Sequence, residues 1–183
     1  SLGGGHVDAR QLGGGTDGNV TFNSGGQIIM QTSKIIYANQ LKMTAVGGIT
    51  DGAAGSVSTQ VASLNNISNT GSGDIKISNT GNLTFSDGGS LGYGVNQQAA
   101  GGGIFVTTTP TNTLGVFAPV IAQGGPVTLS SPGGVTFVAY TAGSPNAGGG
   151  VFSNGGAVTI SAADASAAIN MPASSLISSG GGA

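Results

Sequence analysis

Apolar and polar residues alternate over short stretches of this chain, and the alternation restarts after a glycine. The stretch GDIKISNTGNLTF, residues 73–85, has apolar residues at positions 75 and 77, a polar turn with Gly81, and apolar residues again at 83 and 85. A period of two is that of a half-buried β-strand. The stretch therefore predicts two strands that are joined at a corner and face the same interior.

The same unit occurs elsewhere in the chain. GNVTFNSGGQIIM from Gly18 and GPVTLSSPGGVTF from Gly125 share its spacing, and a weaker copy, GAVTISAADASAAI from Gly156, keeps the first apolar pair. These residues are expected to form columns that point inward: Val20, Phe22, Ile28, Met30, Ile75, Ile77, Leu83, Phe85, Val127, Leu129, Val135, Phe137, Val158 and Ile160.

The units are interpreted as rungs of a solenoid rather than as β-hairpins. Their corners are longer than the two-residue Asn-Gly turns that hairpins favour, and further short strands fill the gaps between units. The unit spacing suits rungs of roughly 17 to 26 residues. We expect an all-β parallel β-helix that runs continuously over 1–183, with roughly seven to ten rungs and a length of roughly 35 to 45 Å. A helix over 162–171 is the one alternative to strand structure.

Composition agrees with this architecture and excludes some partners. The chain has 37 glycines for tight corners, only 5% charged residues, no cysteine and a net charge of −2. A nucleic-acid partner would need a basic face, and the longest apolar runs, such as 116–122, are too short to insert into a membrane. The glycine-rich ends, 1–5 and 179–183, are expected to be junctions to neighbouring repeats or subunits.

The repeated units, with LNNISNTGSGDI leading into one of them, resemble filamentous haemagglutinin-type exoproteins. These are bacterial adhesins that are exported by two-partner secretion or related routes. The resemblance covers roughly residues 15 to 170 and implies a right-handed β-helix, a secreted or cell-surface location, and a role in adhesion, biofilm matrix or surface fibres. The sequence contains no candidate for the family's N-terminal secretion domain.

The leading hypothesis is a structural, non-enzymatic fibre or adhesin segment that assembles end to end by strand stacking. Its expected partners are further copies of itself and a polysaccharide or host-surface receptor, and no cofactor or metal is expected. One alternative is a polysaccharide-degrading β-helix, either a lyase or a depolymerase, which would need acidic and basic residues to converge on one face. Another is an ice- or crystal-binding solenoid.

Few residues offer chemistry for an enzyme. His6, near Asp8 and Arg10, would need a nucleophile to form a catalytic group, and its position near the terminus favours a solvated residue instead. Asp74 and Lys76 are predicted to form a surface ion pair. The remaining aspartates are mostly in Asp-Gly dipeptides that are typical of turns: Asp17, Asp51 and Asp87, with Asp164 apart from them.

Three further segments have a binding interpretation and a plainer structural one. GGGTDGNV, residues 13–20, is faintly similar to a calcium-binding repeat, but a glycine-rich turn explains it better. Alternating threonines could form an ice-binding row, or a solvated edge: Thr107, Thr109, Thr111 and Thr113. Four aromatic residues could form a carbohydrate platform, although their scattered positions favour ordinary packing: Tyr37, Tyr93, Phe117 and Tyr140.

Overall fold

The computed structural model describes residues 5–11, 17–53, 55–87, 92–141 and 148–180. The described part of the chain contains nineteen strands and no helix, and all of the strands join one continuous sheet through parallel pairs. The expected all-β parallel β-helix is therefore confirmed. The alternative helix over 162–171 is wrong, because this segment contains turns and the short strand β18 (Ile169–Asn170).

From the seventh strand onward, the chain passes over three faces in a fixed order. Face 1 contains β7 (Ile67–Asn69), β10 (Val95–Gln97), β13 (Val120–Ala122), β16 (Gly150–Phe152) and β19 (Leu176–Ser178). Face 2 contains β8 (Ile75–Asn79), β11 (Ile104–Thr108), β14 (Val127–Ser130) and β17 (Val158–Ser161). Face 3 contains β9 (Leu83–Ser86), β12 (Leu114–Val116), β15 (Val135–Phe137) and β18.

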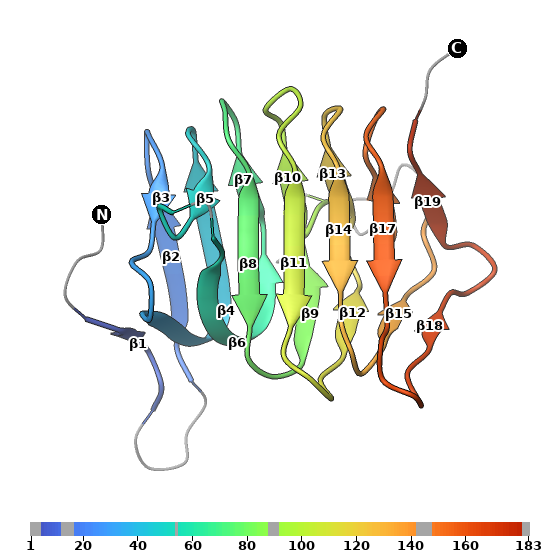
Figure 1. Ribbon diagram of the computed structural model, residues 1–183, viewed down its shortest axis with the longest axis horizontal. Helices are drawn as coiled ribbons and strands as arrows, with labels where there is room; N and C mark the ends of the chain where they lie inside the picture. The colour runs from blue at the N-terminus through green and yellow to red at the C-terminus, as the bar shows by residue number, and fades with distance from the viewer. Residues whose placement is uncertain (1–4, 12–16, 54, 88–91, 142–147, 181–183) are drawn as a thin grey trace.

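The coil is right-handed. In Figure 1 the face-2 strands point down on the near side while the chain advances from left to right, and the chain returns upward on the far side. Each strand pairs with the strand at the same place one rung earlier and one rung later. Every rung therefore contacts its neighbours in the stack, as in other solenoids.

The first rungs are built from six strands, two of which bend through corners. They are β1 (Val7–Asp8), β2 (Asn19–Asn23), β3 (Ile28–Ile29), β4 (Ile35–Ala45), β5 (Ile49–Thr50) and β6 (Val57–Asn65). The long strand β4 pairs with β6 along its first part and with β7 at its end, so one unbroken strand covers what shorter strands cover in later rungs.

The rungs differ in length more than the sequence predicted. Successive register partners in one inward column of face 2 are Ile28, Ile49, Ile75, Ile104, Val127 and Val158. Their numbers show that a rung takes from 21 to 31 residues, against the expected 17 to 26. The longest rungs have their extra residues in the corners between β9 and β10 and between β15 and β16, while the strands keep their register.

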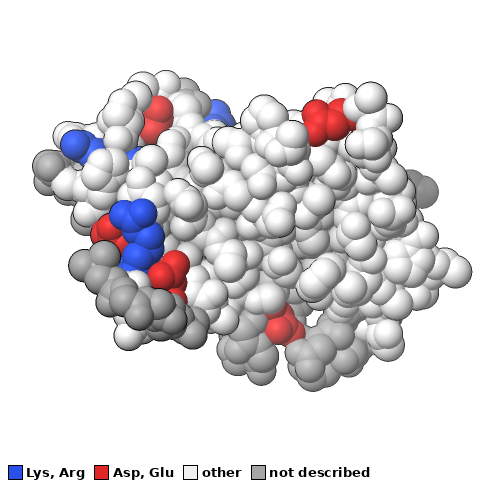
Figure 2. Space-filling model, turned by 90° about the horizontal axis from the view of Figure 1, so that it is seen from below, with Lys and Arg blue, Asp and Glu red and all other residues white. Residues whose placement is uncertain are grey.

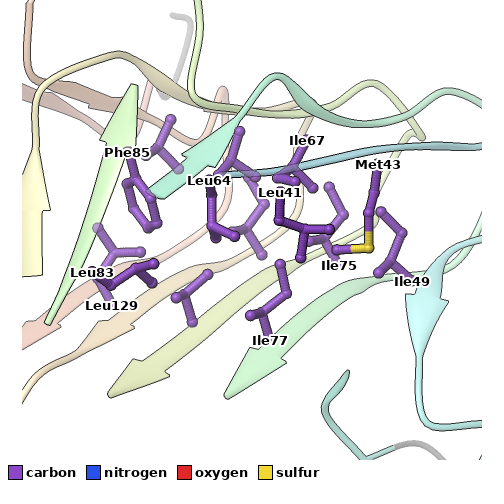
Figure 3. Close-up of a cluster of buried hydrophobic side chains, with 14 of the residues drawn as sticks. Leu41, Met43, Ile49, Leu64, Ile67, Ile75, Ile77, Leu83, Phe85 and Leu129 are labelled. Atoms are coloured by element: carbon purple, nitrogen blue, oxygen red, sulfur yellow. The ribbon is translucent and has the colours of Figure 1, made fainter. Parts of the chain in front are cut away.

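The three faces enclose one apolar core, in which the inward side chains of successive rungs stack in columns. Figure 3 shows Leu41, Leu64, Phe85 and Ile77 among the side chains that meet in this interior. Ten of the fourteen predicted inward residues are buried. The other four, in the first and last rungs, are partly buried against the core: Val20, Phe22, Val158 and Ile160.

The first repeated unit lies out of phase with the others. Val20 is the register partner of Leu41, in the face-3 column that continues through Leu64 and Phe85, whereas Ile75 and Val127 share a column of face 2. The unit that begins at Gly18 therefore starts on face 3, whereas the unit that begins at Gly73 starts on face 2. Period-two alternation recurs on all three faces of the coil, so sequence spacing alone does not distinguish the faces.

The corner between faces 1 and 2 brings glycine backbones into close contact. A Cβ added at Gly102 would lie 2.6 Å from the carbonyl oxygen of Gly73, and one at Gly125 would lie 2.0 Å from that of Gly102. One at Gly156 would lie 2.1 Å from the carbonyl oxygen of Gly125. We call these four residues the glycine column. Its rungs approach so closely that only glycine fits.

Candidate functional site

The most distinctive surface of the molecule is its C-terminal end. The last rung contains β17, β18 and β19, and within the described residues each of these strands pairs only with the preceding rung. One backbone edge of each strand is therefore unpaired. Exposed strand edges of this kind can accept a further strand.

The same end leaves part of the apolar core uncovered. Ile169 follows Val135 in an inward column and is 43% exposed, although Val135 is fully buried. Ile177 follows the buried Val151 in the same way and is 37% exposed. Met171, two residues beyond Ile169, is 44% exposed. Among the residues that the structure describes, no further rung lies over these side chains. We call Val158, Ile160, Ile169, Met171 and Ile177 the open end.

The N-terminal end has a comparable edge. Strands β1, β2 and β3 each pair on one side only, with β4 or β5, among the residues that the structure describes. Val7, Val20 and Phe22 are only partly buried there. At both ends, unpaired backbone groups of the strands and partly exposed apolar side chains are therefore arranged as they are in an interior rung. The predicted junctions at 1–5 and 179–183 lie outside the described residues, except for Gly5 and residues 179–180.

Polar side chains inside two corners are hydrogen-bonded across rungs. The Asn69 side chain accepts from Gly48 N–H at 3.0 Å and donates to Gln97 Oε1 at 2.9 Å, and Gln97 donates to Gly73 O at 2.8 Å. At the other corner, Asn79 accepts from Val61 N–H at 3.0 Å. These buried amides satisfy backbone groups that the turns leave without partners, so their role is structural.

A column of hydroxyl side chains runs along the outside of face 2. Its members are successive register partners, namely Ser58, Ser78, Thr107, Ser130 and Ser161. We call this column the hydroxyl ladder. The hydroxyls repeat at the strand spacing of about 4.8 Å. Sequence reasoning missed the ladder because its members come from five different rungs.

The predicted threonine row does not form on one strand. Thr107 lies in β11, but the strand ends at Thr108, and Thr111 has a φ of 67° in the turn that follows. Thr109, Thr111 and Thr113 therefore belong to a corner. The Asn112 side chain donates to Thr109 Oγ1 at 2.8 Å there.

His6, Asp8 and Arg10 meet around Tyr37 at the N-terminal end. Arg10 Nε donates to Asp8 Oδ1 at 2.9 Å, and the guanidinium lies 3.8 Å from the centre of the Tyr37 ring. The hydrogen bond from the Arg10 side chain lowers the pKa of Asp8 to about 2. His6 Nδ1 accepts from Ile35 N–H at 3.0 Å. These contacts attach the first strand to β4.

The other aspartates act mainly as backbone acceptors. Asp51 accepts from Gly55 N–H at 2.7 Å, Asp17 from Gln11 N–H at 3.1 Å, and Asp164 from Thr111 N–H at 3.2 Å. Asp74 accepts from a backbone N–H at 2.9 Å and forms the predicted ion pair with Lys76 at 3.2 Å. Within the described ranges, acidic and histidine side chains nowhere gather in the groups of three that could hold a metal ion.

Charged side chains are sparse on the surface as a whole. On the face seen in Figure 2 they gather toward the N-terminal end, and apart from isolated acidic side chains the rest carries none.

The first part of the calcium-like stretch, 13–16, lies outside the described residues. No helix in the described residues is long and apolar enough to cross a membrane.

The aromatic residues do not form one platform. The Tyr37 ring lies beside His6 in the first rungs, whereas Tyr140 contacts Phe152 near the C-terminal end, with ring centres 5.3 Å apart. Phe117 is exposed and lies over Gly115 of the same chain segment, while Tyr93 is half-buried before β10.

Comparisons with models of protein families, with curated proteins and with solved structures find no match to this chain.

Proposed function

We propose that the chain is a structural segment of an extracellular fibre or adhesin, which is extended by stacking a further rung on its open end. The observation that carries this proposal is the apolar cross-section at Ile169, Met171 and Ile177. Less than half of each side chain is exposed, so covering them contributes roughly 1 kcal/mol each. Unpaired strand edges on the same rung give the added rung a hydrogen-bonding template.

The geometry favours a second copy of this chain as the source of that rung. The N-terminal end presents strands in the same parallel direction, so the head of one copy can follow the tail of another. Such a contact is heterologous and does not close on itself, and contacts of this kind form filaments. The extracellular location and the role in surface attachment or biofilm matrix rest on the resemblance to haemagglutinin-type exoproteins.

The test is assembly of the purified chain. Light scattering and negative-stain imaging are expected to show growth with concentration and thin unbranched filaments. The double variant Ile169→Lys/Ile177→Lys places two charges on the open end and is expected to stay monomeric. Thr159→Lys is the matched control, since Thr159 points outward from the same rung and is exposed. A wild-type chain that stays monomeric at high concentration would contradict the proposal.

The hydroxyl ladder supports a second candidate function, binding to an ordered surface such as ice or a crystalline polysaccharide. Its five hydroxyls repeat regularly, and Thr128 and Thr159 extend the array sideways in the two rungs nearest the C-terminus. Lys76 and Phe105 occupy the neighbouring column in the earlier rungs and reduce the array. Thermal hysteresis that is lost in Ser130→Leu would support this candidate, and its absence in the wild-type chain would exclude ice.

A polysaccharide-degrading activity finds less support in the described residues, because most of the aspartates are engaged by backbone groups of turns. Release of reducing ends from a panel of acidic polysaccharides is the measurement that would bring this alternative forward.

A further inference from the structure

Two columns of outward-facing residues run from one end of the stack to the other. Each residue in them is the register partner of the next, one rung further on. The outer column of face 3 starts in β2 and ends in β18: Asn19, Gln40, Ser63, Thr84, Gly115, Thr136 and Asn170. The outer column of face 1 also starts in β2 but ends in β19: Asn23, Thr44, Ser68, Asn96, Ile121, Phe152 and Ser178. Each column therefore has seven members.

The N-terminal end is stepped rather than flat. The inward column of face 2 begins at Ile28 in β3 and ends at Val158 in β17, and it has only six members. The described residues before Ile28 do not reach this part of face 2, because β1 pairs with Ile36 and Tyr37, further along the rung. Strand β2 therefore lies one strand spacing beyond β3 at this end.

The step decides how a second copy can be seated on the open end. If β3 of the second copy directly followed β17, its β2 would occupy the level that β18 and β19 already fill, and this seating is sterically excluded. If β2 of the second copy follows β18 and β19 instead, Asn19 lies over Asn170. In the same seating, Asn23 lies over Ser178. One strand then continues both outer columns without a gap.

The side chains that this seating brings together are compatible. Asn19 and Asn170 are both exposed. A carboxamide both donates and accepts, so two asparagines on stacked strands can hydrogen-bond to each other. On the inward side, the partly buried Val20 lies over Met171, which is 44% exposed, so the contact covers an apolar pair. None of these four residues is charged, so no like charges oppose each other.

We propose that copies of the chain join in this seven-strand register, with β2 of one copy pairing with β18 and β19 of the copy before it. The inference rests on the proposed end-to-end assembly and adds to it the segment that docks and the register in which it docks. Successive copies in a filament lie seven strand spacings apart, so the axial repeat is about 34 Å. The described residues of the joint form strand pairs on faces 3 and 1 and leave the outer edge of β17 free.

The test is disulfide cross-linking across the joint, in a chain that has no cysteine of its own. In Asn19→Cys/Asn170→Cys the two sulfurs come from adjacent strands of different copies, about 4.8 Å apart, which is within the range that a disulfide spans. Within one chain the two positions are at opposite ends of the stack (Figure 1) and about 29 Å apart, so each bond must link two copies. Mild oxidation is expected to give a ladder of covalent oligomers that reduction returns to monomer.

The matched control is Ile29→Cys/Thr159→Cys, which reports the excluded register in which β3 follows β17. Ile29 follows Ile28, and Thr159 follows Val158. In the proposed register these two positions are two strand spacings apart, about 10 Å, which is too far for a disulfide. We therefore expect no ladder from this pair. An equal or stronger ladder from the control pair would overturn the proposal.

The axial repeat of wild-type filaments, measured by electron cryomicroscopy, gives a test without cysteines. A repeat of about 34 Å supports the seven-strand register, and one of about 29 Å, six strand spacings, contradicts it. Filaments that form without a ladder from Asn19→Cys/Asn170→Cys would overturn the register and leave end-to-end assembly standing. A wild-type chain that forms no filaments would overturn both.

Discussion

At the scale of single residues, the fold depends most on positions where successive rungs touch through their backbones or share one side chain. The glycine column is the clearest case, because the space that a Cβ would occupy is already filled by a carbonyl oxygen. The buried amides are the second case, since each one satisfies backbone groups of more than one rung. Apolar core positions are more tolerant, because a column of Val, Ile and Leu accepts exchanges of similar volume.

Gly125→Ala is predicted to destabilise the protein by about 3 kcal/mol, because the new methyl group would overlap the carbonyl oxygen of Gly102 and force two rungs apart. Gly25→Ala is the control, since a Cβ there meets no atom within 4 Å. Urea unfolding followed by circular dichroism measures both. Equal midpoints for the two variants would show that the corner relaxes at little cost.

Asn79→Ala is predicted to cost about 3 kcal/mol, since it leaves the Val61 N–H and the Thr59 hydroxyl without their acceptor inside the corner. Asn82→Ala removes an exposed amide three residues away, whose oxygen accepts from Thr113 N–H at 2.9 Å, and is expected to cost much less. The same unfolding experiment compares the pair. A similar loss in both variants would argue against a special role for the buried amide.

At the scale of strands and corners, the sequence predicted the strands of the later rungs well and their phase less well. Units at Gly73 and Gly125 have the predicted strand, corner and strand because the glycine turns separate two clear alternations. The unit at Gly18 has the spacing of the later units but starts on face 3 rather than face 2. The sequence does not reveal this difference, because β4 and β6 run through corners without a glycine and so the start of each early rung is not marked.

Features that cross rungs were beyond sequence reasoning. The hydroxyl ladder and the glycine column each combine residues from several rungs, and their assembly depends on rung lengths that vary from 21 to 31 residues. One local signal was present: the consecutive pair Asn65-Asn66 between two apolar residues breaks the alternation where this rung takes one residue more than β4 does between Leu41 and Thr44.

The attachment of β1 to β4 gives a prediction for pH. Asp8 has a pKa of about 2 in the folded chain, below its ordinary value of 3.8, chiefly because the Arg10 side chain donates to it. Since the folded-state pKa is the lower one, the contact stabilises the fold above about pH 4 and is lost as the pH falls toward 2. The effect on global stability is expected to be small, because the pair is exposed.

Arg10→Met is expected to return the pKa of Asp8 to near 3.8, as measured by an NMR titration of its carboxyl group. Lys34→Met serves as the control and should leave the titration of Asp8 unchanged. If Asp8 still titrates near pH 2 in Arg10→Met, backbone contacts rather than the guanidinium hold its carboxylate.

At the scale of the whole molecule, the solenoid is a one-dimensional stack in which each rung depends on its neighbours. Removing residues 155–183 deletes β17, β18 and β19, and it exposes the previous rung in the same way as the present open end. The truncated chain is predicted to remain folded, with a β-sheet circular dichroism spectrum and a lower urea midpoint. Loss of all structure on truncation would show that the stack folds as a single unit instead.

The parallel direction of all strands makes the two ends of the stack unlike. A filament of such chains would be polar, with two different ends. Further copies of the chain would join these two ends at different rates. Growth watched at single filaments would then reveal a fast tip and a slow tip, and a surface that captures one of them would align every fibre in the same sense.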